Sequence, residues 1–137
     1  NKAMKLAGRN NVTINYQVGA FFELELMKDK FDVAALIFAH FATDIASDYH
    51  KKVAELLKPN GMIIIEGFSK NHFELQKINP NAGGPKNIDM LFSKETIKRD
   101  FQNFEMIKLE ETEVELKEGL FHNGKARVIQ FIGRKKL

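Results

Sequence analysis

The side chains best suited to move a proton or orient a substrate lie at the ends of predicted strands. His40 follows the apolar run Val33–Phe38, Glu66 ends the next apolar run, and His122 precedes Asn123-Gly124, a dipeptide typical of tight turns. Histidine changes charge near neutral pH and a carboxylate accepts hydrogen bonds, so both suit acid–base chemistry. Each also has a structural interpretation: His40 bonded to the backbone, Glu66 capping a turn, and His122 simply exposed.

Other kinds of site are excluded by what the sequence lacks. The chain has no cysteine, which removes disulfides, cysteine nucleophiles and cysteine-based metal sites. Its histidines do not have the spacing of metal ligands, so no metal site is predicted. No Ser–His–Asp arrangement stands out either.

A loop rich in Gly, Pro and Asn, at residues 79–87, contains the glycine pair Gly83-Gly84. No strand directly precedes this pair, so we do not interpret it as a phosphate or cofactor loop. Residues 81–86 fit a substrate lid, as long glycine-rich loops often do, or an ordinary connector.

The elements that position these residues form a strand–helix–strand unit between Phe31 and Phe68. Val33–Phe38 is almost wholly apolar, as in a strand covered on both faces. A helix follows, and Pro59-Asn60-Gly61 ends it before the strand Met62–Glu66. The buried stripe of the helix is expected at Ile45, Tyr49, Val53, Leu56 and Leu57.

Other elements flank this unit. The apolar spacing predicts a helix over Lys2–Gly8, and the alternation in Val12–Val18 predicts a strand. Phe21–Lys30 fits a short helix or an irregular crossing. Ser93 is a plausible helix cap. The buried face of the helix it begins is expected at Ile97, Phe101 and Phe104.

The last third of the chain predicts two adjacent antiparallel strands. Ile107 and Leu109 lie in the opposite phase to Val114 and Leu116, which predicts a β-bulge near Glu110–Thr112. A long strand over 125–133 follows the predicted Asn-Gly turn.

Charged residues support that strand pairing. Glu113 and Glu115 are expected to face Lys125 and Arg127 across the pair. The resulting fold class is α/β, with a mainly parallel sheet finished by a C-terminal antiparallel pair, in a single domain over residues 1–137.

The order of these segments resembles the second part of a class I S-adenosylmethionine-dependent methyltransferase. The resemblance is closest to a small bacterial branch related to tellurite-resistance methyltransferases. Its segments are, in order, FDVAALIFAHF, LKPNGMIIIEGF, NAGGPKNIDML and EVELKEGLFHNGKARVIQFIGRK. The similarity covers nearly the whole chain and implies a Rossmann-like methyltransferase sheet.

The resemblance implies cofactor contacts at two places. It puts the loop Gly19-Ala20-Phe21 beside the adenine of S-adenosylmethionine, and Phe38 and Ala39 in the same site. Phe21 and Phe38 could flank the adenine, although aromatic residues at strand ends are more often core residues. Family members commonly have an aspartate where Ala20 stands, and losing such a buried partner typically costs about 1–3 kcal/mol.

The resemblance also implies a catalytic role for His40, near the position of methyl transfer. Contacts to substrate are expected from Glu66, Gly83, Gly84 and His122. Methyl transfer from a sulfonium proceeds by in-line displacement, so the protein mainly orients the nucleophile and removes its proton.

The family's glycine-rich loop and the acidic residue that holds the ribose are both absent from the sequence. They belong to N-terminal strands at the centre of the family's sheet, which are missing here. We therefore expect the chain to be the C-terminal portion of a methyltransferase-like domain. It is either a fragment or a truncated form that closes its sheet as a homodimer or by strand exchange.

The predicted function is transfer of a methyl group from S-adenosylmethionine to a small acceptor by the complete protein, with weak or no cofactor binding by this chain alone. The alternative is a non-catalytic α/β module used for protein association. The net charge of +3, with a basic chain end at 134–136, does not indicate nucleic-acid binding. No apolar run approaches the length of a membrane span and no signal peptide is visible, so a cytoplasmic location is expected.

Overall fold

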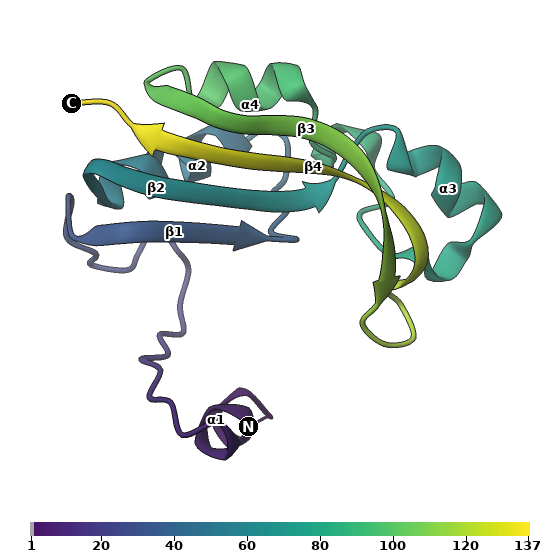
Figure 1. The fold of residues 1–137 in the computed structure, drawn as a ribbon, viewed down its shortest axis with the longest axis horizontal. Coiled ribbons are helices and arrows are strands. Elements are labelled where there is room, and N and C mark those ends of the chain that lie inside the picture. Colours follow the sequence, from purple (N-terminus) through teal and green to yellow (C-terminus); the bar gives the residue numbers. More distant parts are fainter. Residues whose placement is uncertain (1) are drawn as a thin grey trace.

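A four-stranded mixed sheet forms the centre of the structure, a computed structural model that describes residues 2–137. The strands are β1 (Phe31–Ile37), β2 (Leu57–Phe68), β3 (Phe104–Lys117) and β4 (Asn123–Lys135). They lie in the order β1-β2-β4-β3 (Figure 1). β1 and β2 are parallel, whereas β4 runs antiparallel to both of its neighbours. This confirms the α/β class and the closing antiparallel pair.

The helices in residues 2–137 are α1 (Lys2–Arg9), α2 (Ala46–Leu56), α3 (His72–Ile78) and α4 (Lys94–Asp100), with short 3₁₀ turns at Pro80–Ala82 and Ile88–Met90. Three of these four helices lie in the connections between strands, and α1 precedes the first strand. In the described part of the chain, no helix is long and apolar enough to cross a membrane.

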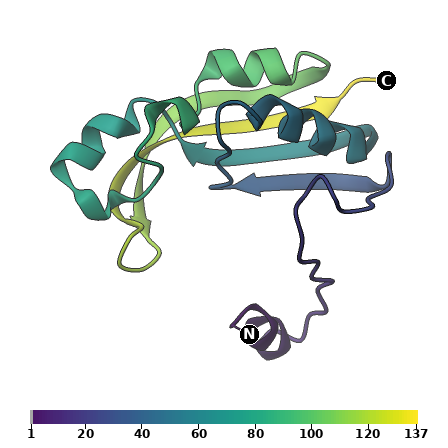
Figure 2. The ribbon, with the colours of Figure 1, turned by 180° about the vertical axis from the view of Figure 1, so that it is seen from behind.

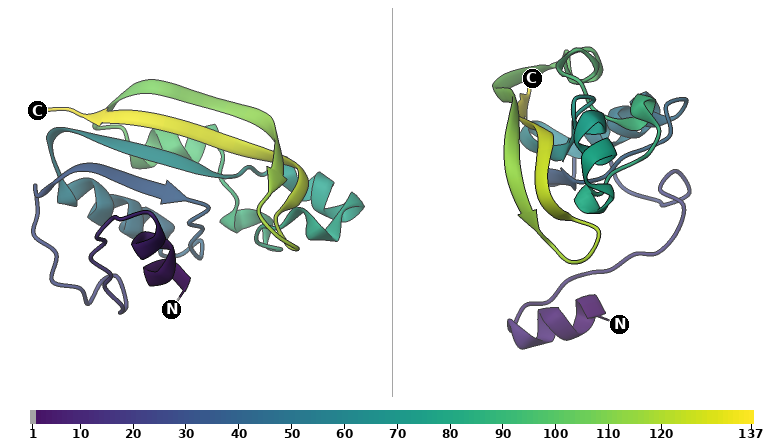
Figure 3. Two further views of the ribbon diagram at one scale, coloured as in Figure 1. Left: turned by 60° about the horizontal axis from the view of Figure 1, so that its bottom comes forward. Right: turned by 90° about the vertical axis from the view of Figure 1, so that its right-hand side faces the viewer.

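The sheet is covered on one face only. Helices α2 and α4 lie together on that face, as Figure 2 and the right-hand view of Figure 3 show. The core between them is fully buried and centres on Ile63, Ile65, Ile97, Phe101 and Phe131.

The opposite face of the sheet has no helix on it within residues 2–137. Val33 and Ile37 of β1 are 52% and 54% exposed, and Ile64 of β2 is 37% exposed. The prediction that the first strand is covered on both faces is therefore wrong for residues 2–137. The strand is apolar on both sides, but only Ala34 and Leu36 pack against the core.

The predicted strand Val12–Val18 is also wrong. The segment has no regular structure, and all four of its apolar side chains are at least 42% exposed. It connects α1, which lies away from the sheet, to the edge of β1 (Figure 1). A strand forms only where a neighbour supplies hydrogen bonds, and no strand of residues 2–137 lies beside this segment.

The β3–β4 pair confirms the expected register. Glu113 lies opposite Arg127 and Glu115 opposite Lys125, and the Lys125 ammonium group contacts the Glu113 carboxylate at 3.0 Å. The turn prediction was misplaced, because Asn123-Gly124 already belongs to β4. The turn is formed by residues 118–122 instead.

The predicted bulge near Glu110–Thr112 is absent, and the register shifts between Met106 and Lys108 instead. The change of phase that suggested the bulge has another cause. Leu109 packs on the main core, whereas Val114 and Leu116 pack on a second cluster formed with Phe68 and Val128. The strand thus buries first one side and then the other as the pair curls toward α3 (Figure 1).

Helix α4 begins as predicted and is joined to α2 by a buried polar contact. The Ser93 hydroxyl accepts a hydrogen bond from the Thr96 N–H, and Thr96 bonds back to the Ser93 N–H, a capping box. At the other end of α4, the Asp100 carboxylate lies 2.7 Å from Nδ1 of His50 on α2. Both side chains are almost fully buried, at 4% and 2% exposure.

The Asp100 carboxylate is also bonded to Ser47 and Arg99. Its oxygen Oδ1 accepts from the Ser47 hydroxyl at 3.0 Å and from Nε of Arg99 at 2.8 Å. Burial alone would raise the pKa of Asp100, but the hydrogen bonds from Arg99, His50 and Ser47 outweigh it. The pKa of Asp100 therefore lies below its ordinary value of 3.8.

We predict that Asp100→Ala lowers the free energy of unfolding by about 3–5 kcal/mol, because it leaves His50 buried without its partner. Since the pKa of Asp100 is lower in the folded state, its contribution is present above about pH 4 and is lost as the pH falls further. Urea unfolding at pH 7 and at intervals below pH 4 measures both effects.

The control for this prediction is Glu74→Gln, which removes an exposed carboxylate that pairs only with Lys77. It should change the free energy of unfolding by less than about 1 kcal/mol. Equal effects of the two substitutions would show that the buried contact does not join the helices.

Candidate functional site

The carboxyl ends of β1 and β2 lie on the side of the sheet where the β3–β4 hairpin curls past α3 (Figure 1). Aromatic rings from these segments pack together there. The ring of Phe68, the last residue of β2, has four neighbours with centroids within 5.7 Å. They are Phe38, His40, His72 and His122. Ligands of α/β proteins bind at this end of parallel strands, so the ring cluster is the candidate site.

His40 lies in this cluster with both ring nitrogens bonded to the backbone. Nε2 accepts a hydrogen bond from the Phe68 N–H at 3.0 Å, so Nδ1 carries the proton and donates it to the Met90 carbonyl oxygen at 3.0 Å. Burial lowers the pKa of His40 more than the bond to Met90 raises it. This geometry favours the structural interpretation of His40, and its catalytic role stays a prediction.

His72 is bonded in the same manner, although no sequence motif singles it out. Nδ1 accepts from the Arg127 N–H at 3.3 Å, and Nε2 lies 3.2 Å from the carbonyl oxygen of Gly83. The ring is fully buried and stacks on Phe68 at 4.3 Å. Burial lowers the pKa of His72 below 6.5, which favours the neutral form that these bonds require.

Gly83 and Gly84 pack directly against the cluster. Their φ angles are +83° and +87°, values that L side chains rarely adopt. A Cβ atom on Gly83 would lie 2.5 Å from Cδ2 of His122, and one on Gly84 would lie 2.8 Å from the Phe68 ring. The Gln76 amide donates to the Gly83 carbonyl at 2.6 Å and ties the loop to α3, which favours the connector interpretation.

His122 is a partly exposed histidine of the cluster. Its side chain is 33% exposed, and Nδ1 lies 3.3 Å from the Glu118 carboxylate. Its ring meets Phe38 and Phe68 edge to face at 5.2 and 5.4 Å. Among the predicted site residues, the fold thus brings together Phe38, His40, Gly83, Gly84 and His122.

The predicted cofactor residues fall into two separate groups. Phe38 and Ala39 lie half-buried at the carboxyl end of β1, where Phe38 has a φ of +50° and donates its N–H to the Glu66 carbonyl. Phe21 instead stacks on Tyr49 of α2, and its carbonyl oxygen accepts from the Lys52 ammonium group at 2.6 Å. The two phenylalanine rings therefore pack against different partners.

The residues present fit one wall of an S-adenosylmethionine site. Phe38 and Ala39 supply apolar surface at the strand end, where an adenine could pack. Gly19 packs against Leu24, and Ala20 offers no side-chain acceptor. The only glycine pair lies in the loop that packs against His122, so no open glycine cradle for the cofactor occurs within residues 2–137.

Glu66 lies apart from the ring cluster, in the interior of β2. Its carboxylate accepts from the Gln130 amide at 2.6 Å, and Gln130 in turn accepts from Lys108 at 2.7 Å. These side chains form a polar row across three strands on the uncovered face of the sheet. The contact of Glu66 with a substrate stays a prediction. The Glu66 side chain bonds to Gln130 and does not cap the turn after the strand.

Two other kinds of site find no support in the part of the chain that the structure describes. No group of three His, Asp or Glu side chains is placed to hold a metal ion. Ser47, His50 and Asp100 are close together, but the serine hydroxyl bonds to Asp100 and not to the histidine. The arrangement therefore lacks the serine–histidine contact of a hydrolase triad.

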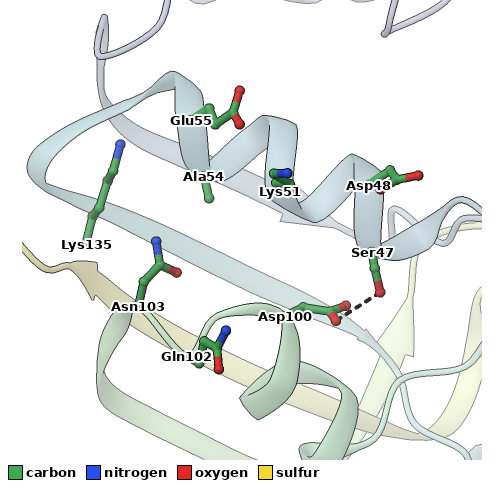
Figure 4. A pocket seen from close by; sticks show the side chains of 9 residues that line it. All are labelled: Ser47, Asp48, Lys51, Ala54, Glu55, Asp100, Gln102, Asn103 and Lys135. Carbon is green, nitrogen blue, oxygen red and sulfur yellow. Dashed lines mark hydrogen bonds between the residues drawn. The ribbon is translucent and has the colours of Figure 1, made fainter.

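A hollow of about 510 Å³ lies elsewhere, between α2 and the turn after α4 (Figure 4). Ala54 of α2 and Lys135 of β4 line it, and the Lys135 ammonium group bonds to the carbonyl oxygen of Leu57, the first residue of β2. The hollow therefore lies at the end of β2 opposite to its carboxyl end. It contains none of the predicted site residues. Its full lining is Ser47, Asp48, Lys51, Ala54, Glu55, Asp100, Gln102, Asn103 and Lys135.

Glu118 and His72 are the site residues that sequence reasoning missed. The signal for Glu118 was present, because it lies four residues before His122 across a short connection between two strands. A carboxylate and an imidazole at the two ends of such a turn can meet, as they do here. Nothing in the local sequence of His72 indicates that it would be buried.

We predict that Gly83→Ala destabilises the fold more than Gly119→Ala does. Both glycines have positive φ angles, so each alanine costs about 1–2 kcal/mol of backbone strain. Only at Gly83 does the new methyl group meet His122, which adds about 1–3 kcal/mol. Urea unfolding of both variants measures the difference, and equal losses would contradict the close contact of loop and ring.

Solved structures of other proteins have the same fold as this chain. No protein-family model matches the chain, and no curated protein matches it. Solved structures do. A SAM-dependent methyltransferase from Methanosarcina mazei has 19% identity and a TM-score of 0.65, over 88% of this chain and 66% of that one.

Two further structures agree. TehB from Haemophilus influenzae has 14% identity and a TM-score of 0.69, over 97% of this chain and 45% of its own length. The 1,6-didemethyltoxoflavin-N1-methyltransferase of Burkholderia thailandensis was solved with 1,6-didemethyltoxoflavin and S-adenosylhomocysteine. It has 16% identity and a TM-score of 0.63, and the match covers 99% of this chain and 57% of that one. The chain thus spans 45–66% of these three proteins and has the Rossmann-like fold of class I SAM-dependent methyltransferases.

Proposed function

We propose that this chain is part of a methyltransferase that transfers a methyl group from S-adenosylmethionine to a small acceptor. The observation that carries the proposal is the ring cluster at the carboxyl ends of β1 and β2, in a fold shared with methyltransferases. The fold alone would not support a function, because one fold hosts many. The cluster adds apolar walls, a solvent-facing histidine and a fixed glycine loop at the edge where ligands bind.

Each side chain of the cluster has a role in this proposal. When bound, S-adenosylmethionine supplies a methyl group on a positively charged sulfur. Phe38 and Ala39 form the apolar wall beside it. The loop at Gly83-Gly84 borders the acceptor, and His40 and His72 hold the loops and strand ends in place through their backbone bonds. A cytoplasmic location and a small-molecule acceptor stay predictions.

We predict that the 137-residue chain alone binds S-adenosylmethionine weakly or not at all, because it supplies one wall of the site without a glycine cradle or a polar adenine partner. Titration calorimetry measures this binding. A form extended by the upstream coding sequence should bind in the micromolar range if that sequence contains a glycine-rich turn after a strand. Micromolar binding by the 137-residue chain would contradict the prediction, and no binding by either form would argue against the function.

The alternative is a protein-association module without catalytic activity. The unpaired edge of β1 and the exposed side chains of Val33, Ile37 and Ile64 favour it, because such surfaces pair with other strands. This alternative is compatible with the predicted homodimer or strand exchange.

If the alternative holds, the chain should self-associate at micromolar concentration, and Val33→Lys should shift it toward monomer by adding a charge beside the open edge. Sedimentation velocity across a concentration series measures the association. Glu74→Gln, which removes an exposed charge on α3 and leaves the edge of β1 unchanged, is the control. A well-folded monomer throughout the series would exclude association through this surface.

A further inference from the structure

The histidines around Phe68 differ in one respect that bears on proton transfer. In His40 and His72, both ring nitrogens are within hydrogen-bond distance of backbone groups. Neither ring has a free lone pair, so neither can take a proton without breaking a bond that holds the fold. In His122, only Nδ1 has a partner in residues 2–137, and that partner is the Glu118 carboxylate.

The contact with Glu118 determines which nitrogen of His122 is free. An ionised carboxylate only accepts hydrogen bonds, so Nδ1 donates its proton to Oε2 of Glu118 across 3.3 Å. Nε2 then keeps its lone pair. A histidine oriented by a carboxylate on one nitrogen and open on the other is the usual arrangement of a general base.

The ring of His122 is also held in position, although it lies in a turn. The Glu118 N–H donates to the His122 carbonyl oxygen at 2.9 Å and closes the turn. The edges and faces of Phe38 and Phe68 enclose one side of the ring. The backbone of Gly83 packs so closely that a Cβ atom there would lie 2.5 Å from Cδ2 of His122, which limits movement of the ring.

We propose that His122 is the proton acceptor of the reaction and that Glu118 is its positioning residue; this rests on the proposed methyl transfer. The acceptor is a small molecule with a hydroxyl or thiol group. As its oxygen or sulfur bonds to the methyl carbon, the carbon–sulfonium bond breaks and its electron pair stays on sulfur. The proton of the hydroxyl or thiol moves to Nε2 of His122 and then to water.

The acceptor class follows from the surroundings of Nε2. The rings of Phe38 and Phe68 give the imidazole of His122 an apolar border, which suits a neutral molecule. A hydroxyl or thiol is a poor nucleophile until it loses its proton, so a base close by is of most use to these groups.

The first test measures the free nitrogen directly. In ¹⁵N-labelled protein at pH 7.5, the imidazole shifts of His122 should show protonated Nδ1 and unprotonated Nε2. Glu118→Gln should lose this preference, whereas Glu115→Gln on the same hairpin should keep it. Diethyl pyrocarbonate should modify His122 about tenfold faster than His40 or His72, because their lone pairs are already hydrogen-bonded. Protonated Nε2, or equal modification of the three, would overturn the proposal.

The second test uses the protein that carries this chain, S-adenosylmethionine, and a panel of small phenols and thiols. His122→Gln should lower kcat by about 10²–10⁴-fold with little change in the KM for S-adenosylmethionine. Glu118→Gln should cause a smaller loss of kcat, and Glu115→Gln none. Full activity of His122→Gln would show that His122 is not the proton acceptor, without contradicting the proposed methyl transfer. No transfer by the unmodified protein would overturn both proposals together.

Discussion

The ring of Phe68 is the contact on which the candidate site depends. It ends β2, and segments from four parts of the chain pack against it: the residues after β1, helix α3, the glycine loop and the hairpin turn. An aromatic side chain suits this place because it offers two faces and an edge to neighbours at low cost in conformational entropy. Smaller apolar residues at this position would leave the surrounding loops without a shared support. The candidate site is thus held together by a buried core residue.

The histidines of the candidate site differ in whether their ring nitrogens bond to the backbone or to a side chain. His40 and His72 satisfy backbone groups that loops at a sheet edge would otherwise leave unpaired. Burial and this bonding keep both rings neutral. His122 lies on a turn, where one side faces solvent and the nearest polar group is a side chain. Within one cluster, His40 and His72 therefore hold backbone segments in place, whereas His122 keeps one ring nitrogen without a partner in residues 2–137.

Much of the fold could be predicted from local patterns, and the errors have a common physical origin. The strand–helix–strand order, the Ser93 cap and the pairing of Glu113 with Arg127 follow from period, capping and charge within short segments. The predicted break at Pro59-Asn60-Gly61 is wrong, because β2 already begins at Leu57 and contains these residues. Val12–Val18 alternates like a strand, but a strand needs a partner that the local sequence does not reveal. For the candidate site, the end of the first predicted strand indicated His40, the Asn-Gly dipeptide indicated His122, and the family resemblance indicated Phe38. Their approach to Gly83 results from the curl of the hairpin, which no local pattern specifies.

The open edge of β1 has a consequence for the chain in a concentrated solution. Its sequence, FDVAALI, is apolar and rich in β-forming residues, with one charge and no proline. Proteins commonly protect such edges with charges, proline or a covering loop, and here the protection is the single exposed contact between Asp32 and Lys58. Segments of this composition stack readily into cross-β fibrils. A strand paired with this edge would therefore also keep it from joining other copies of the chain.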